Sequence, residues 1–279
     1  MLLCVYLLLV ACTTSPPNAV TNSTISPQSV KKLGIFHWEQ RHKINQAKKA
    51  LQYFELATKQ NPNDSEMAVL YSRACYFNGH YIETDPIIKD SLFIKGAVAA
   101  QSTILQQSGS TSSPTIIENS GNPWLVNAEN ISEELVPIYY WWAANVGRYL
   151  IDKPIHERLR YRDLLESIFH QLLTLNPNFH YGGPYRLMAV FYVRIPGIEL
   201  VHSESYFSLA INSFPDYFAT AVLKAQFYCT KSGQRDEFHK LLTEIVQADL
   251  SAMPDSYAEN LFEQKMAKRL LNQESLLFK

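Results

Sequence analysis

Residues 41–65 decide the fold class and read RHKINQAKKALQYFELATKQNPNDS. A helix over residues 41–60 would carry small and apolar side chains along one face, namely Ala47, Ala50, Leu51, Phe54 and Ala57. Pro62 follows directly, and a proline just past a helix end cannot continue the helix. The stretch therefore predicts a helix that packs one face against a neighbour and stops near residue 60.

The same spacing recurs further along the chain. A capped start at Ser65 leads into a second helix, with a turn predicted at Gly79, His80 and Tyr81. Two later stretches repeat the apolar spacing before a proline: Leu165, Phe169, Leu172 and Pro177, then Phe207, Ala210 and Pro215. Such spacing is typical of tetratricopeptide repeats, whose small residues let paired helices approach. We predict an all-α, tetratricopeptide-like helix-hairpin superhelix over residues 31–279.

Composition supports helices and argues against a nucleic-acid partner. The chain has 279 residues, of which 47% are hydrophobic, so it can bury one sizeable core or two small ones. Only 10 residues are glycine, and few segments alternate with a period of two. The 25 basic and 26 acidic residues are spread evenly, so no broad basic face is available for a phosphate backbone.

The first twelve residues have the pattern of a lipoprotein signal. Residues 1–12 are mostly apolar but too short for a bilayer span, which takes about 20 helical residues. Leu9, Val10, Ala11 and Cys12 resemble a lipobox, which predicts a lipid on Cys12. Residues 13–30 are rich in Ser, Thr, Pro and Asn and predict a flexible linker. We expect a lipid-anchored protein on the periplasmic side of the envelope, with the outer membrane favoured because Thr13 is not Asp; an apolar N-terminal helix of a cytosolic protein is the alternative.

The cysteines do not predict a disulfide framework. Cys4 would be removed with the signal and Cys12 would be lipidated, which leaves Cys75 and Cys229 far apart in sequence. Both lie in apolar helical stretches, so we expect two buried thiols that pack as small hydrophobic groups. A bridge between them stays open from the sequence.

No enzymatic motif is present in the sequence. The eight histidines are scattered singly, and neither a His-x-x-x-His nor a Cys-x-x-Cys spacing suggests a metal site. A glycine-rich phosphate loop and a Gly-x-Ser-x-Gly nucleophile elbow are also absent from the sequence. We predict a protein without catalytic residues, bound metal or cofactor.

An aromatic segment lies between the two groups of repeats. Residues 85–105 predict a long helix, residues 106–123 a polar loop, and residues 133–151 a further helix. That last helix carries Tyr139, Tyr140, Trp141 and Trp142 in succession. Since successive helical residues point about 100° apart, four adjacent aromatics cannot face one core. The helix must be buried on nearly every side or must line a cavity.

The order of these features resembles the T-component family of tripartite ATP-independent periplasmic (TRAP) transporters. The resemblance rests on the lipobox at Cys12, the aromatic segment 137–147, and the segment 175–186, which reads LNPNFHYGGPYR. It continues through Phe191-Tyr192, Ile195-Pro196-Gly197, the helix 203–213 and the C-terminal stretch 258–271. It implies a helical superhelix, a tendency to form a homotrimer, and a periplasmic solute-binding protein as partner.

Gly182, Gly183 and Pro184 predict a turn that leads into a helix. The free N–H groups of that helix start would attract an anion, and Arg186 lies close behind. Our hypothesis is a carboxylate-tipped ligand at Arg186 that lies along an aromatic wall of Tyr139, Trp142 and Tyr185. The alternative is a tight turn between repeats with a structural arginine.

Two functional classes remain. The first is a periplasm-facing lipoprotein accessory of a TRAP-type uptake system, which docks a solute-binding protein and binds or passes a hydrophobic or carboxylate ligand through a helical pore. The alternative is a tetratricopeptide-like scaffold lipoprotein in outer-membrane or pilus assembly. An envelope protein that binds glycan or peptidoglycan through exposed aromatics is a weaker third reading.

Overall fold

The computed structural model describes residues 26–107, 126, 128 and 131–279. All regular secondary structure within these ranges is helical and no strand occurs among them, which confirms the predicted all-α class. The tetratricopeptide-like character stays a prediction. The lipobox, Cys12 and most of the predicted loop 106–123 lie outside the described residues. No helix of the described ranges has the length and apolar character that crossing a membrane requires.

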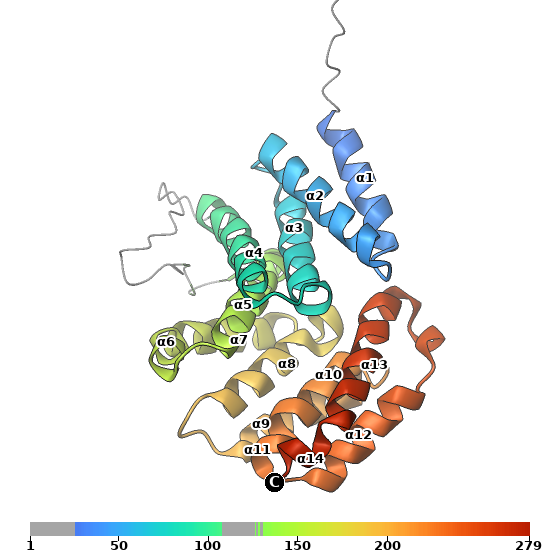
Figure 1. Ribbon diagram of the computed structural model, residues 1–279. Coiled ribbons are helices and arrows are strands. Elements are labelled where there is room, and N and C mark those ends of the chain that lie inside the picture. The colour runs from blue at the N-terminus through green and yellow to red at the C-terminus, as the bar shows by residue number, and fades with distance from the viewer. Residues whose placement is uncertain (1–25, 108–125, 127, 129–130) are drawn as a thin grey trace, which may run out of the picture.

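The N-terminal half is a series of helices that pack in chain order (Figure 1). Its members are α1 (Pro27–Glu39), α2 (Ile44–Gln60), α3 (Ser65–Phe77), the π-helical turn η1 (Asn78–Ile82), α4 (Pro86–Gln107), the 3-10 turn η2 (Glu133–Leu135) and α5 (Val136–Ile151). Helix α1 starts within the segment expected to be linker, because the Ser26 side chain caps it by accepting from the Ser29 amide at 3.3 Å. Helix α2 stops two residues before Pro62, as its sequence predicts.

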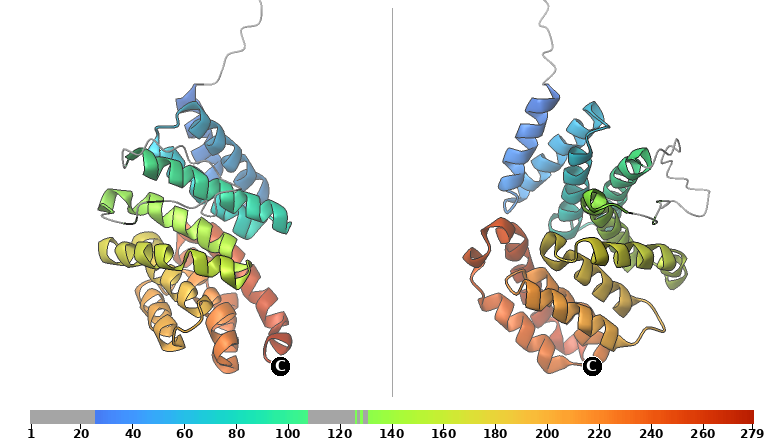
Figure 2. Two further views of the ribbon diagram at one scale, coloured as in Figure 1. Left: turned by 90° about the vertical axis from the view of Figure 1, so that its left-hand side faces the viewer. Right: turned by 180° about the vertical axis from the view of Figure 1, so that it is seen from behind.

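The C-terminal half continues the array and turns back toward its start. It contains α6 (Ile155–Arg160), α7 (Arg162–Leu175), α8 (Phe179–Arg194), α9 (Leu200–Ser213), α10 (Phe218–Leu223), η3 (Lys224–Cys229), α11 (Thr230–Ser232), α12 (Arg235–Gln247), η4 (Leu250–Ala252), η5 (Pro254–Ser256), α13 (Tyr257–Asn272) and α14 (Glu274–Leu277). The first turn of α13 lies beside the connection between α1 and α2 (Figure 2). Segments more than 200 residues apart in the chain therefore meet at the centre of the molecule.

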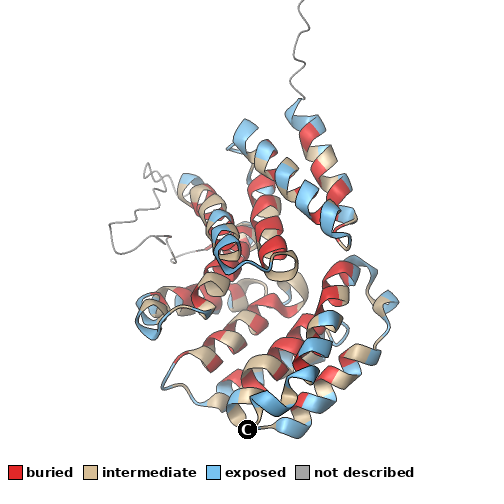
Figure 3. Ribbon diagram, viewed as in Figure 1, coloured by how far each residue is buried: buried red, intermediate tan, exposed pale blue. Residues whose placement is uncertain are grey.

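Three apolar clusters hold these helices together, and buried residues line the facing sides of the helices (Figure 3). One joins α4, α5, α7 and α8; a second joins α8 to α13; a third joins α1 to α3 and includes Phe262 of α13. The residues that carried the predicted helix spacing are buried, with Leu51 half-buried. They are Ala47, Ala50, Phe54, Ala57, Leu165, Phe169, Leu172, Phe207 and Ala210.

The aromatic helix and the cysteines follow their predicted placement. All residues of α5 from Ile138 to Val146 are buried, which confirms burial around the whole helix. Cys75 and Cys229 are both buried and free. They belong to different apolar clusters, so the disulfide that the sequence left open does not form. Burial raises the pKa of each thiol to about 12, which keeps both protonated and unreactive.

Candidate functional site

An apolar cavity lined by arginines lies between α5, α7 and α8. Its volume is about 80 Å³, enough for several water molecules or a small ligand group. The walls are apolar side chains of the three helices, chiefly Leu165, Phe169, Leu187, Val190, Phe191 and Ile195. Four arginines also line it: Arg148, Arg158, Arg186 and Arg194. Such a number of cations around an apolar space is unusual because a buried charge is costly without a partner.

Arg186 occupies one end of this cavity and is held by neutral groups. It is 5% exposed and donates to the carbonyls of His180 at 3.1 Å and Tyr181 at 3.0 Å. It also donates to the hydroxyls of Tyr140 and Thr220, each at 3.2 Å. No ion pair within the described ranges includes Arg186. Its positive charge is therefore solvated by dipoles but is not neutralised.

A left-handed turn at the start of α8 presents the two carbonyls to Arg186. The φ angles of His180, Tyr181 and Gly182 are 47°, 58° and 69°. Positive φ is rare for aromatic residues and costs about 1–3 kcal/mol each, so such residues cluster where function or packing demands them. Here the turn swings the His180 ring toward the centre, where its Nε2 lies 3.2 Å from the Tyr217 hydroxyl. The turn that the two glycines predict is present, and Arg186 stabilises it.

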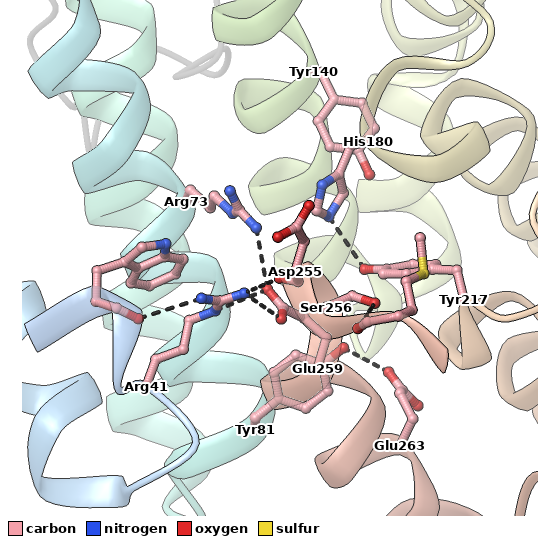
Figure 4. Close-up of polar contacts among 12 residues, drawn as sticks. Arg41, Arg73, Tyr81, Tyr140, His180, Tyr217, Asp255, Ser256, Glu259 and Glu263 are labelled. Carbon is pink, nitrogen blue, oxygen red and sulfur yellow. Dashed lines mark hydrogen bonds and ion pairs between the residues drawn. The ribbon is translucent and has the colours of Figure 1, made fainter. Parts of the chain in front are cut away.

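A buried ion triad closes the array beside this turn (Figure 4). Both carboxylate oxygens of Glu259, on α13, accept from Arg41, at 2.7 and 3.2 Å, and Arg73 donates to one of them at 3.2 Å. The two guanidinium groups also stack on the Trp38 ring, at 4.8 and 5.1 Å from its centroid. Burial by itself would raise the pKa of Glu259, but Arg41 and Arg73 outweigh it and lower the pKa. The carboxylate stays charged and joins α13 to the N-terminal helices.

A second polar group lies next to the triad, around Glu263. The Tyr81 hydroxyl donates to Glu263 at 2.6 Å, and the His80 Nε2 is 3.7 Å from the same oxygen. Arg148 lies 2.9 Å from that His80 nitrogen, which must accept because the guanidinium has only donors. Burial and Arg148 lower the pKa of His80 to about 4, although Glu263 opposes this shift. His80 is therefore neutral at physiological pH.

This neutral histidine makes stability depend on pH. As the pH falls below the ordinary histidine pKa of 6.5, the unfolded chain takes up a proton that folded His80 refuses until about pH 4. Stability should therefore drop by about 2 kcal/mol from this residue between pH 7 and pH 5. His80→Gln keeps an acceptor for Arg148 and should flatten the dependence. Urea unfolding at the two pH values measures this; equal slopes for both proteins would contradict it.

The structure separates the residues that the sequence grouped as a ligand site. Arg186 lines the cavity, but the aromatics beside it are Tyr140 and Tyr217, and not Tyr139, Trp142 or Tyr185. Trp142 is fully buried, and its Nε1 donates to Gln101 of α4 at 3.3 Å. Tyr139 is buried, and Tyr185 is half-buried and packs against Tyr206 of α9.

The two glycines have different roles from each other. Gly182 takes the positive φ. Gly183 gives Tyr140 room, because a Cβ there would lie 2.4 Å from its ring. Arg148, Arg158 and Arg194 were not predicted from the sequence, although Val193-Arg194-Ile195 places an arginine in an apolar context. Within the described residues, no cluster of three His, Cys, Asp or Glu side chains could hold a metal ion.

Comparison with known proteins identifies the family. The sequence model of the family described as TRAP transporter T-component matches residues 90–278, which is more than half of the chain and includes α5, α7 and α8. No curated protein matches the sequence significantly. The family comprises components of transporters and not enzymes, and it implies association with other TRAP components in the cell envelope. The cavity helices lie within the matched segment, and the chain belongs to the T-component family of TRAP transporters.

Proposed function

We propose that this chain is a periplasm-facing, lipid-anchored accessory that docks the solute-binding protein of its TRAP system and binds a ligand in the arginine-lined cavity. Family membership supports the accessory role. The observation that carries the ligand is Arg186, a buried cation without a carboxylate partner at the end of an apolar space. The ligand would have an apolar body and a carboxylate directed at Arg186.

The groups around Arg186 suit a carboxylate. The Tyr140 hydroxyl accepts from Arg186, so its own hydrogen can point to a ligand oxygen. Burial raises the pKa of Tyr140 although Arg186 opposes this, so the phenol keeps that hydrogen. Arg148 lines the same cavity and donates to the Tyr76 hydroxyl at 3.3 Å, again without an ion pair. An anion here would meet two cations and one hydroxyl donor, and charge-assisted hydrogen bonds are the stronger kind.

The docking part is tested by pull-down. The full chain would be used to capture proteins from the envelope fraction of its own cell, with bound proteins identified by mass. Recovery of a solute-binding protein supports the proposal. Recovery of outer-membrane or pilus assembly proteins in its place supports the scaffold alternative, and the transport role would then be abandoned. The same sample run on a sizing column with light scattering tests the trimer that the family resemblance implies.

The ligand part predicts a loss on removal of the Arg186 charge. Arg186→Met should lower the affinity for a short-chain carboxylate such as butyrate by about tenfold or more, because a charge-assisted hydrogen bond is lost. Calorimetric titration measures the affinity, and mass spectrometry of the purified protein reports carboxylates carried from the cell. Thr220→Val is the matched control, since it removes one neutral partner of Arg186 and keeps the charge. Unchanged binding by a folded Arg186→Met protein would refute this ligand site.

A further inference from the structure

Three cations gather in a second pocket where α8 ends, and we name them the cationic mouth: Arg158 of α6, Arg194 of α8 and Lys231 of α11. The pocket has a volume of about 510 Å³, and α11 and α14, labelled in Figure 1, contribute to its lining. Its other lining residues include the apolar side chains of Val193, Phe227, Leu270 and Leu277. One pocket thus combines three positive charges with an apolar floor.

Within the described residues, the three cations donate hydrogen bonds only to backbone carbonyls. Arg158 donates to the Arg194 carbonyl at 3.0 Å, Arg194 to the Ile151 carbonyl at 2.6 Å, and Lys231 to the Val193 carbonyl. These carbonyls belong to the C-terminal ends of α5 and α8, each of which carries about half a negative charge. Within the described ranges none of the three cations forms an ion pair. The partial negative charges of two helix ends do not balance the three full positive charges of these side chains.

The remaining electrostatics also favour an anion at this pocket. The Nε atoms of Arg158 and Arg194 are buried and have no hydrogen-bond partner. Burial and the neighbouring Arg158 lower the pKa of Arg194, and exposed Asp152 opposes this only in part. Burial, Arg194 and Arg158 likewise lower the pKa of Lys231. Burial and mutual repulsion together therefore outweigh local compensation, and an oxyanion between the three groups would relieve the repulsion.

We propose that the cationic mouth binds the oxyanion head group, carboxylate or phosphate, of a single-chain amphiphile whose chain lies over Phe227, Leu270 and Leu277. The head group follows from the three positive charges that line the pocket without a carboxylate partner among the described residues. The chain follows from the floor, where Leu277 is 39% exposed. Arg158 and Arg194 also line the arginine-lined cavity, but Arg186 lies eight residues before Arg194 on α8, about 12 Å along the helix, so an anion at the cationic mouth would lie apart from the carboxylate proposed at Arg186. It does not depend on the proposed function.

The probe is dodecyl phosphate. It is titrated into the full chain at low salt and below its critical micelle concentration. It should bind about tenfold or more tightly than both inorganic phosphate and dodecyl maltoside, which test the head group and the chain separately. Arg158→Met and Lys231→Met should each weaken binding by about tenfold. The matched control is Arg269→Met on α13, an exposed arginine that lines neither pocket. Higher salt should weaken binding to the wild-type protein.

Several results would overturn the proposal. If inorganic phosphate bound as tightly as dodecyl phosphate, the alkyl chain would contribute nothing to binding. If dodecyl maltoside bound as tightly as dodecyl phosphate, the anionic head group would contribute nothing. Binding to anionic vesicles without binding to monomeric dodecyl phosphate would indicate a membrane contact and not an amphiphile pocket. Lys231 is exposed, so Lys231→Met should fold, and unchanged affinity in that variant would exclude the cationic mouth. Arg186→Met should bind dodecyl phosphate normally, which separates this outcome from failure of the cavity ligand.

Discussion

Glu259→Gln should lower the free energy of unfolding by about 3–5 kcal/mol, because it leaves buried Arg41 and half-buried Arg73 without their counter-ion. Arg41 and Glu259 have side chains only 9% and 5% exposed, so water cannot replace the lost carboxylate charge. Gln keeps the size of the side chain, which makes the loss a measure of charge and not of packing. Urea unfolding followed by circular dichroism gives the value by linear extrapolation.

Glu66→Gln is the control for this prediction. Glu66 pairs with Lys31 at 2.6 Å, a shorter distance than the Arg41 pair, but its side chain is 65% exposed. An exposed ion pair contributes about 0–1 kcal/mol, so this variant should remain close to the wild-type protein. Similar losses in the two variants would contradict the role given to the buried triad.

The triad also shows what the sequence cannot reveal. Arg41 and Glu259 are 218 positions apart, and each lies at a place where a charged residue usually points into solvent. Only the return of α13 to the N-terminal helices brings them together, and that return depends on the summed packing of all the helices between them. The helices themselves were predictable because local spacing, as at Ala50 and Phe54, reports which face is buried.

Part of the candidate site was predictable because it rests on local sequence patterns. The segment 175–186 carried the turn and Arg186, since Gly182 and Gly183 indicate an unusual backbone. The aromatic wall was assigned to Tyr139, Trp142 and Tyr185, whereas Tyr140, next to Tyr139 on α5, lines the cavity. Adjacent residues on a helix point about 100° apart, and the rotation of a helix that is buried on all sides is set by its neighbours. In an amphipathic helix, the polar positions of the sequence indicate which side faces solvent and so how the helix is rotated. Helix α5 has no polar face that could indicate its rotation.

The apolar surroundings on α8 also make the roles of its two cavity arginines hard to predict. Arg186 and Arg194 lie on one helix whose apolar residues suggest a core. Arginine in such a context looks structural because it can donate to carbonyls, as both residues do here. The feature that distinguishes them is the lack of a carboxylate partner, which becomes visible only when the positions of all nearby acids are known. Both proposed ligand sites therefore rest on charges that the fold leaves unpaired.

Gly183→Ala should lower the free energy of unfolding by about 3 kcal/mol and should disturb the cavity at the same time. The added Cβ would lie 2.4 Å from the Tyr140 ring and 2.7 Å from its hydroxyl oxygen. That ring cannot move easily, because Trp141 and Phe179 pack against it with centroids 5.0 and 5.1 Å away. Displacing Tyr140 would also break its 3.2 Å hydrogen bond with Arg186. Urea unfolding and carboxylate titration report the two effects.

Gly147→Ala and a double variant make this prediction specific. Gly147 lines the same cavity from the middle of α5, but an added Cβ there meets nothing within 4 Å. Since alanine favours a helix over glycine, Gly147→Ala should stabilise the protein by about 0.5–1 kcal/mol. In a Tyr140→Ala background the collision at Gly183 disappears, so Gly183→Ala should cost little more there. A full additive loss in the double variant would show that the glycine is required by its backbone and not by the tyrosine.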